Sequence, residues 1–252
     1  MNQYERERVL ETELCKYQLM PFLRDKVRQL PYPFTEELEK SIAVEILAQM
    51  LFYKRTSPSV LIGLLHNRFH NTQKCLEVLN ELIEQDYLDY SANDQVITKL
   101  CLSTEDSEKL AKMMYPQPMV VPPNKLKRNS DTGYWYMPKG CVVLRSHFQD
   151  KDVNLDHLNR VNSVKLKINK EVLHNRENKP KKELPTIQDR ANWNKFVRQQ
   201  REIAESYEDT EFYLTHKYDK RGRIYCQGYH ISYQSNDFTN ALVEFANGEK
   251  CI

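Results

Sequence analysis

Apolar residues recur every three or four positions through most of residues 1–115, and this spacing predicts a mainly helical N-terminal part. One amphipathic helix is predicted over 1–29, before Pro31 and Pro33 interrupt the pattern. The acidic run after Thr35 favours another helix start, because acidic side chains are stabilised in the first turn of a helix. Further helices are predicted over 36–54, 58–65, 72–85 and 103–115.

The segments 87–90 and 95–100 have the composition of two strands around a polar turn, which predicts a β-hairpin. Two helices followed by a hairpin are also typical of a winged-helix DNA-binding domain. The helix over 72–85, which Thr72 is predicted to cap, carries one lysine, Lys74, and three glutamates, whereas a helix that reads DNA is expected to be basic. A winged-helix-like transcription regulator that binds DNA without a partner chain is nevertheless one hypothesis for its function.

The proline-rich stretch over 116–123 marks the clearest boundary in the chain, and the residues after it mix strand and helix patterns. Apolar-aromatic strands are predicted at 212–214 and 224–225, on either side of a polar turn. Strand, turn and strand are predicted over 133–147, with helices over 157–178, 187–207 and 237–247 and a basic linker at 179–185. The predicted fold class is α+β.

The charge of the chain is unevenly distributed. Residues 1–115 hold 14 Lys and Arg against 18 Asp and Glu, a balance of −4, and residues 116–252 hold 23 against 17, a balance of +6. A polyanionic partner would favour the second half, although ordinary surface variation gives the same pattern. Six scattered cysteines without metal-site spacing, no apolar run of membrane length and no secretory signal predict a cytoplasmic protein with no membrane partner.

The turn DKRGR, residues 219–223, carries the most suggestive local chemistry. Gly222 permits a positive φ and close approach to a ligand, and the guanidinium of Arg223 presents a planar fork of donors that suits phosphate oxygens. Tyr225 projects from the same strand face and has a ring on which a base can stack, while the carboxylate of Asp219 can orient Arg221 or Arg223. A surface hairpin with incidental arginines is the alternative interpretation.

The same residues resemble a known family. DKRGRIY, 219–225, is similar to the DxxGR motif of the phage-type single-subunit RNA polymerases, a class that includes mitochondrial enzymes. QSNDFT, 234–239, resembles the segment that follows this motif in the family. Other landmarks occur in the family's order at similar intervals, namely VVPP at 120–123, GYW at 133–135, LRSH at 144–147, LN at 158–159 and KINKEVL at 167–173. The resemblance covers about residues 85–252.

The resemblance implies an N-terminal domain over 1–152, a shortened thumb over 153–212 and the start of the palm over 213–252. The DxxGR segment would bind template DNA and the RNA–DNA hybrid, and basic side chains of the thumb would grip the same strands. The hairpin at 86–101 falls where the family keeps a hairpin that holds melted DNA apart. The residues implied to contact nucleic acid are Asp219, Arg221, Gly222, Arg223, Tyr225, Lys195, Arg198, Arg201, Arg145 and His147.

No residue of this sequence matches the family's metal-binding aspartates, which lie further along than residue 252. The resemblance therefore implies the small chain of a split, heterodimeric polymerase, whose larger partner chain would hold Mg²⁺ and perform nucleotide transfer. Neither a catalytic residue nor a metal ligand is expected in this chain. Dependence on pre-melted DNA, or on an accessory or single-stranded-DNA-binding factor, is a further expectation.

Overall fold

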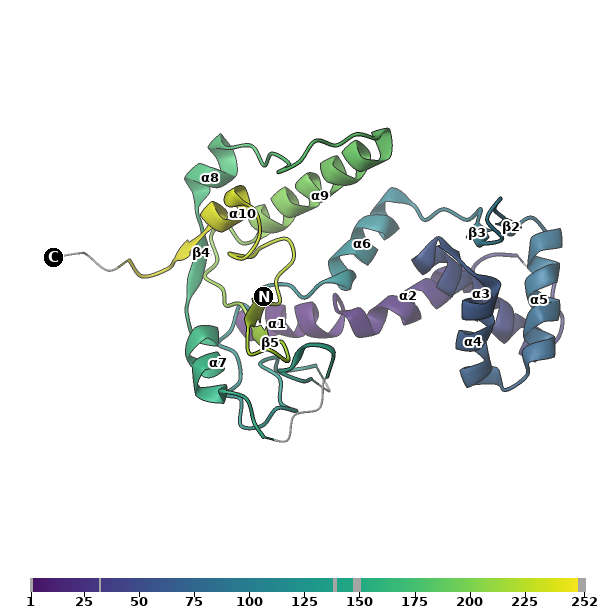
Figure 1. Cartoon of the computed structure of the whole chain (residues 1–252), viewed down its shortest axis with the longest axis horizontal. Helices are drawn as coiled ribbons and strands as arrows, with labels where there is room; N and C mark the ends of the chain where they lie inside the picture. Colours follow the sequence, from purple (N-terminus) through teal and green to yellow (C-terminus); the bar gives the residue numbers. More distant parts are fainter. Residues whose placement is uncertain (1, 32, 138–139, 147–150, 249–252) are drawn as a thin grey trace. The chain divides into compact units, whose positions relative to one another are not determined.

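The computed structural model describes residues 2–31, 33–137, 140–146 and 151–248, and within them combines α-helices with small antiparallel sheets. The chain divides into two compact units (Figure 1). One unit comprises residues 17–110, and the other joins the first 16 residues to 111–252. Among the described residues, no helix is both long enough and apolar enough to cross a membrane.

The unit of residues 17–110 is built on a three-stranded antiparallel sheet and the helices that pack on it. Its strands follow the spatial order β1–β3–β2, with Arg55 opposite Ile97 and Leu88 opposite Thr98. Its elements are α2 (Lys16–Arg28), α3 (Glu37–Tyr53), β1 (Arg55–Thr56), α4 (Pro58–Phe69), α5 (Thr72–Glu84), β2 (Leu88–Tyr90) and β3 (Val96–Thr98), and the boundary at residue 110 falls within α6 (Thr104–Met114). From α3 to β3 these are a helix, a strand, two helices and a hairpin, and the first strand pairs with the last. Winged-helix domains have the same order of elements.

Local sequence explains the sharp turn between α4 and α5. The hydroxyl of Ser57 accepts a hydrogen bond from the backbone N–H of Val60 and begins α4. His70 ends α4 in the left-handed region, with φ 51°. The carboxamide oxygen of Asn71 then accepts from the N–H of Lys74 at 3.0 Å, so Asn71 caps α5 rather than Thr72 as predicted.

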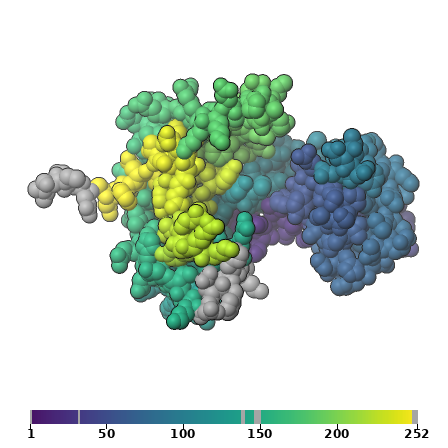
Figure 2. Space-filling model, in the orientation of Figure 1, coloured from purple at the N-terminus to yellow at the C-terminus, as the bar shows by residue number. Residues whose placement is uncertain are grey.

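The unit that contains residues 111–252 is held together by short sheets and helices that enclose a second core. Strand β4 pairs with β7, and β5 pairs with β6, in both cases antiparallel. Its elements are α1 (Gln3–Thr12), the short helix η1 (Leu144–Ser146), α7 (Leu155–Asn162), β4 (Leu166–Ile168), α8 (Lys170–Asn175), α9 (Ile187–Ser206), β5 (His216–Tyr218), β6 (Ile224–Cys226), α10 (Asp237–Leu242) and β7 (Val243–Phe245). Helix α8 packs against both α9 and α10. Figure 2 shows the yellow residues towards the C-terminus next to the green residues of the middle of the chain.

The single helix predicted over 157–178 is wrong. The chain forms α7, β4 and α8 there, because Leu166 and Ile168 bury alternate side chains while their backbone pairs with β7 and Phe212. Asn169 then starts α8 by accepting from the N–H of Val172 at 3.0 Å. The helix predicted over 237–247 is likewise shorter, because the residues from Val243 onward join β4 as strand β7.

The strands predicted over 133–147 are also absent from the described part of that segment. The backbone N–H groups of Trp135 and Met137 donate to the carboxylate of Glu11 at 2.9 and 3.0 Å, and that of Tyr136 donates to the same carboxylate. A buried side chain from α1 therefore satisfies the amides that a neighbouring strand would otherwise pair.

The one long helix predicted over 1–29 is divided into α1 and α2. Glu7 and Glu11 on α1 are buried, and the carboxylate of Glu7 accepts from the N–H of Val120 at 2.6 Å. On α2, by contrast, Leu19 and Leu23 pack into the core of the unit of residues 17–110. The two helices serve different cores, which a single helical pattern does not reveal.

Glu7 makes the stability of the unit of residues 111–252 depend on pH. Burial, together with the neighbouring carboxyl group of Glu11, raises the pKa of Glu7 from 4.5 to about 8. Between these values the unfolded chain loses the proton and the folded chain keeps it, so the free energy of unfolding falls as pH rises from 4.5 to 8 and levels off above. The slope reaches at most about 1.4 kcal/mol per pH unit.

We expect Glu7→Gln to flatten this slope, because glutamine has no proton to lose and still offers an oxygen to Val120. Urea unfolding followed by tryptophan fluorescence reports on this unit alone, since Trp135 and Trp193, the two tryptophans of the chain, both lie in it. An equally steep fall in the variant would show that other groups cause it.

The predicted division into an N-terminal domain over 1–152, a thumb over 153–212 and a palm over 213–252 concerns the working parts of a polymerase. The two compact units are defined instead by contacts within the chain, so they do not test the polymerase division. That division stays a prediction.

Candidate nucleic-acid interface

Asp219 holds the DKRGR turn together through hydrogen bonds to its backbone. Its carboxylate accepts from the backbone N–H groups of Arg221 and Arg223 at 2.9 and 3.0 Å, and Gly222 adopts φ 80° between them. Among the residues that the structure describes, nothing lies within 4 Å of a Cβ added at Gly222, so its backbone conformation alone favours glycine there. The turn is a fixed support for the side chain that follows it.

That side chain is Arg223, which the structure brings together with Tyr225 as predicted. Asp219 forms an ion pair with Arg223 in which one carboxylate oxygen, Oδ2, accepts from both Nε at 2.8 Å and Nη2 at 2.7 Å. The guanidinium carbon also lies 5.7 Å from the ring centroid of Tyr225. The Arg223 side chain nevertheless keeps 61% of its surface exposed, so it is oriented yet open to a ligand.

Asp219 remains ionised at neutral pH. Hydrogen bonds from the backbone N–H and the side chain of Arg223 lower the pKa of Asp219. A hydrogen bond from the Arg221 N–H and the positive charge of Arg223 also lower it, and together these effects outweigh the desolvation of the carboxylate and bring its pKa to about 2. Asp219 therefore acts on Arg223 and does not line the groove described next. Arg221 is exposed at the tip of the turn and also lies outside that groove.

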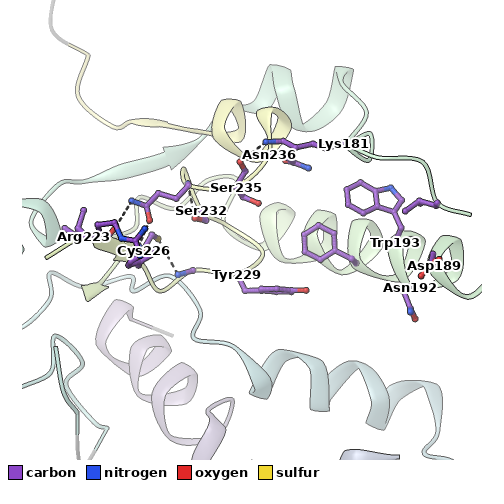
Figure 3. A pocket seen from close by; sticks show the side chains of 16 residues that line it. Lys181, Asp189, Asn192, Trp193, Arg223, Cys226, Tyr229, Ser232, Ser235 and Asn236 are labelled. Atoms are coloured by element: carbon purple, nitrogen blue, oxygen red, sulfur yellow. Dashed lines mark hydrogen bonds between the residues drawn. The ribbon is translucent and has the colours of Figure 1, made fainter. Parts of the chain in front are cut away.

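Arg223 forms part of one wall of a groove of about 930 Å³ (Figure 3), and Tyr225 of β6 also lines this groove. This wall continues from β6 into the loop of residues 227–236. The opposite wall is the first half of α9 with the linker before it. The lining residues are Lys181, Leu184, Asp189, Asn192, Trp193, Phe196, Arg223, Ile224, Tyr225, Cys226, Gly228, Tyr229, Ser232, Gln234, Ser235 and Asn236.

A row of aromatic rings runs along the groove. The ring centroids of Trp193 and Phe196 are 5.6 Å apart, and those of Phe196 and Tyr229 are 5.4 Å apart. Tyr115 stacks on Tyr229 at 3.7 Å, while Tyr229 keeps 43% of its surface exposed. His230 packs on Phe196, and burial lowers the pKa of His230 to about 4, so this imidazole is neutral at neutral pH. The aromatic row is suited to stacking against planar ligands.

A buried polar network fixes the two walls to each other. Gln200 of α9 donates to the carbonyl oxygen of His230 at 2.7 Å and to the hydroxyl of Thr239 at 3.0 Å. It also accepts from the carboxamide of Asn178 at 2.6 Å, and Asn178 in turn accepts from Asn236 at 2.6 Å. Gln200 is 1% exposed, so these bonds have little competition from water.

Gly228 sets the shape of the loop wall. A Cβ at this position would lie 2.0 Å from the carbonyl oxygen of Ile231, a distance at which the backbone must move. The sequence reasoning did not single out Gly228, Gln200 or the aromatic row. The signal that was available is the spacing of Asp189, Trp193, Phe196 and Gln200, which places them on one face of α9.

The predicted basic residues of the thumb lie elsewhere. Lys195, Arg198 and Arg201 are exposed on α9 and do not line the groove. At 100° per residue, Lys195 and Arg198 project from the side of the helix opposite Trp193 and Phe196, while Arg201 projects roughly at a right angle to Trp193. The Nε atom of Arg198 lies 3.8 Å from Oε1 of Glu202. Their contact with nucleic acid stays a prediction, and it would use a different surface.

Arg145 and His147 are the other two predicted contacts. Arg145 is exposed, with φ 60°, and follows Val143, which pairs with Tyr218 at the edge of β5. It therefore lies near the hairpin in the fold but does not line the groove. His147 falls outside the described residues. Within the described ranges, no three His, Cys, Asp or Glu side chains are grouped so that they could hold a metal ion.

Comparison with known proteins relates the chain to transcription. It is 28% identical to a probable DNA-directed RNA polymerase of Agaricus bitorquis in an alignment 232 positions long that covers 76% of this chain and 20% of that protein. A shorter stretch of 49 residues is 41% identical to a probable DNA-directed RNA polymerase of a Gelasinospora species, covering 19% of this chain and 6% of the relative. No family model matches the sequence.

These similarities indicate a relationship to DNA-directed RNA polymerases. The chain spans about a fifth of the longer-matching relative and a smaller part of the other, so only part of such an enzyme corresponds to it.

Proposed function

We propose that this chain is the small chain of a split, phage-type DNA-directed RNA polymerase, and that its groove holds the template strand and the RNA–DNA hybrid. The observation that carries the proposal is the placement of Arg223 across the groove from Trp193 (Figure 3), in a groove that Tyr225 and Phe196 also line. The similarity to two probable RNA polymerases supports the same conclusion.

The groove matches the chemistry of a nucleic-acid strand. The guanidinium of Arg223, held by Asp219, presents its remaining N–H donors to a phosphate oxygen. The aromatic row offers faces to bases, and stacking tolerates every base because each has a π-face. A polymerase must move along any sequence, so contacts of this kind fit its task better than base-specific hydrogen bonds.

Nucleotide transfer requires carboxylates that clamp two metal ions, and we assign Mg²⁺ and its ligands to a larger catalytic chain. The surface that would contact the larger catalytic chain is an apolar groove of about 600 Å³ at the β4–β7 sheet. Val161, Val164 and Leu166 line it together with Val243 and Phe245, and Phe245 is 67% exposed. Two-stranded sheets are marginal alone, and a partner chain that extends this sheet would cover Phe245.

Trp193→Ala is expected to weaken binding of a fluorescent RNA–DNA hybrid by about 1–3 kcal/mol, the usual effect of losing one stacked base. Trp193→Phe is expected to retain most of the affinity, because it keeps a ring in the groove. Ile187→Ala is the matched control, since Ile187 is an apolar residue of the same helix that is 80% exposed and does not line the groove. Equal losses in Trp193→Ala and Ile187→Ala would argue against stacking in the groove.

The functional assignment is tested by recovering the tagged chain from its native cells and assaying RNA synthesis on a primed RNA–DNA hybrid. The purified chain alone is expected to make no RNA, and the recovered complex is expected to make it. Phe245→Asp should lose both the partner and the activity without loss of hybrid binding. Recovery of the chain with DNA only, and no polymerase activity, would favour the winged-helix regulator instead.

A further inference from the structure

A hollow lined by basic side chains lies in the unit of residues 17–110, at the junction of α2, α3 and α4. It has a volume of about 300 Å³, large enough for a phosphate group. The residues around it are Arg24, Arg28, Glu37, Lys40, Ser41, Val44, Glu45 and Arg68. None of them belongs to the groove of the other unit, so the hollow is a separate site.

One buried carboxylate organises the hollow. Glu45, whose side chain is 6% exposed, accepts two bonds from Arg24, at 2.8 Å to Nε and 3.1 Å to Nη2. It also accepts from Nη1 of Arg68 and from the carboxamide of Gln49. Burial raises the pKa of Glu45, but the bonds and charges of these partners lower it more, so Glu45 stays ionised at neutral pH.

The arginines keep donors that Glu45 does not use. Nη1 of Arg68 donates a hydrogen bond to the carboxylate of Glu45, whereas its Nε and Nη2 make no hydrogen bond to this carboxylate. Half of the Arg68 side chain is exposed. Four cations and two carboxylates line the hollow, a balance of +2, which becomes +1 when Asp25, the partner of Arg28, is counted. A fixed guanidinium pair with excess positive charge is suited to an oxyanion.

The helix that normally reads DNA in this fold is unsuited to that role here. Helix α5 carries Glu77, Glu81 and Glu84 against one lysine, a balance of −2. That lysine, Lys74, is paired with Glu39 at 2.6 Å and lies 3.6 Å from Glu77. A phosphate backbone would be repelled from α5, and the α2–α3–α4 hollow offers the opposite charge.

We propose that the hollow at α2, α3 and α4 binds a backbone phosphate of a nucleic-acid strand, so that this winged-helix unit holds the strand without reading its sequence through α5. Glu45 serves as a positioning residue that keeps the forks of Arg24 and Arg68 in place. The ligand is a phosphodiester, and free phosphate is the competing source of the same chemistry.

The test measures the affinity of the full chain for a fluorescent single-stranded DNA over a range of salt concentrations. Arg68→Gln is expected to weaken binding about fivefold and to reduce the salt slope by about 0.7, the value for one lost phosphate contact on a single strand. Lys40 lines the hollow and is paired with Glu37. Lys40→Gln is expected to weaken binding about twofold. Arg55→Gln removes the same charge from an exposed position of this unit outside the hollow and is expected to change affinity less.

Equal losses from Arg68→Gln and Arg55→Gln would overturn the proposal, because they would report general charge and no site. Unchanged affinity in both Arg68→Gln and Lys40→Gln, with folding confirmed by circular dichroism, would overturn it as well. If inorganic phosphate protects Arg68 from phenylglyoxal while DNA does not, the assignment to a strand is wrong. Arg223 variants change binding in the other unit, so failure here leaves the groove untouched.

Discussion

Arg223→Ala is expected to weaken binding of an RNA–DNA hybrid by about 1–3 kcal/mol, or roughly 5- to 150-fold, in a fluorescence titration at fixed low salt. The Arg223 side chain is more than half exposed, lines the groove and is already held in place by Asp219, so a contact with phosphate costs little conformational entropy. The variant should fold normally, because Arg223 packs mainly on its own turn and on Tyr225.

Two companion variants make this result specific. Asp219→Asn keeps acceptors for the turn amides but loses the ion pair, so hybrid affinity should fall less than in Arg223→Ala. Arg201→Ala removes the same charge from an exposed position of α9 that does not line the groove, and we expect less than about a threefold loss, the effect of general charge. A larger loss in Arg201→Ala than in Arg223→Ala would move the binding surface to the outer face of α9.

Gln200→Leu should have the largest effect on stability. The substitution leaves the amide of Asn178 and the carbonyl oxygen of His230 without their partner in a site that water does not reach. Unsatisfied buried groups cost about 1–3 kcal/mol each, so we expect a loss of about 2–4 kcal/mol in the free energy of unfolding. Hybrid binding should weaken too, because the same bonds hold α9 against the loop wall.

The neighbouring Gln199 is the matched control for Gln200. Its amide nitrogen is buried and has no hydrogen-bond partner among the described residues. Gln199→Leu therefore removes an amide that is already unsatisfied and is expected to cost less than about 1 kcal/mol. Urea unfolding followed by tryptophan fluorescence measures both variants, and equal losses would show that the Gln200 network does not stabilise the fold.

The sequence predicted those parts of the fold that depend on neighbouring residues. The DKRGR turn and the hairpin at β2 and β3 are both present, because each is determined within a few positions of the chain. The helix predicted over 187–207 is likewise present as α9.

The prediction failed where distant residues decide the structure. Leu166 becomes part of a strand because Phe212 and Phe245 supply its pairing partners, and residues 135–137 avoid strand structure because Glu11 binds their amides. The apolar and basic positions along 157–178 carry no trace of either partner. A helical period alone cannot distinguish these outcomes.

The candidate site was predicted in the same uneven way. Arg223 and Tyr225 follow from a local motif, and the structure brings them together. Lys195 was chosen by its charge, whereas the groove face of α9 is aromatic and could be found only by knowing which side of the helix meets the loop after β6. A basic residue is easily noticed in a sequence, but its direction depends on the tertiary packing of its helix.

The most direct measurement of the central claim is photo-crosslinking of an RNA–DNA hybrid that carries 5-iodouracil in its template strand, followed by identification of the labelled peptides. If the groove holds the strand, the crosslinks will fall on aromatic residues of its two walls, with Trp193 and Tyr225 foremost. Crosslinks confined to surfaces outside the groove, with none on either wall, would contradict this assignment.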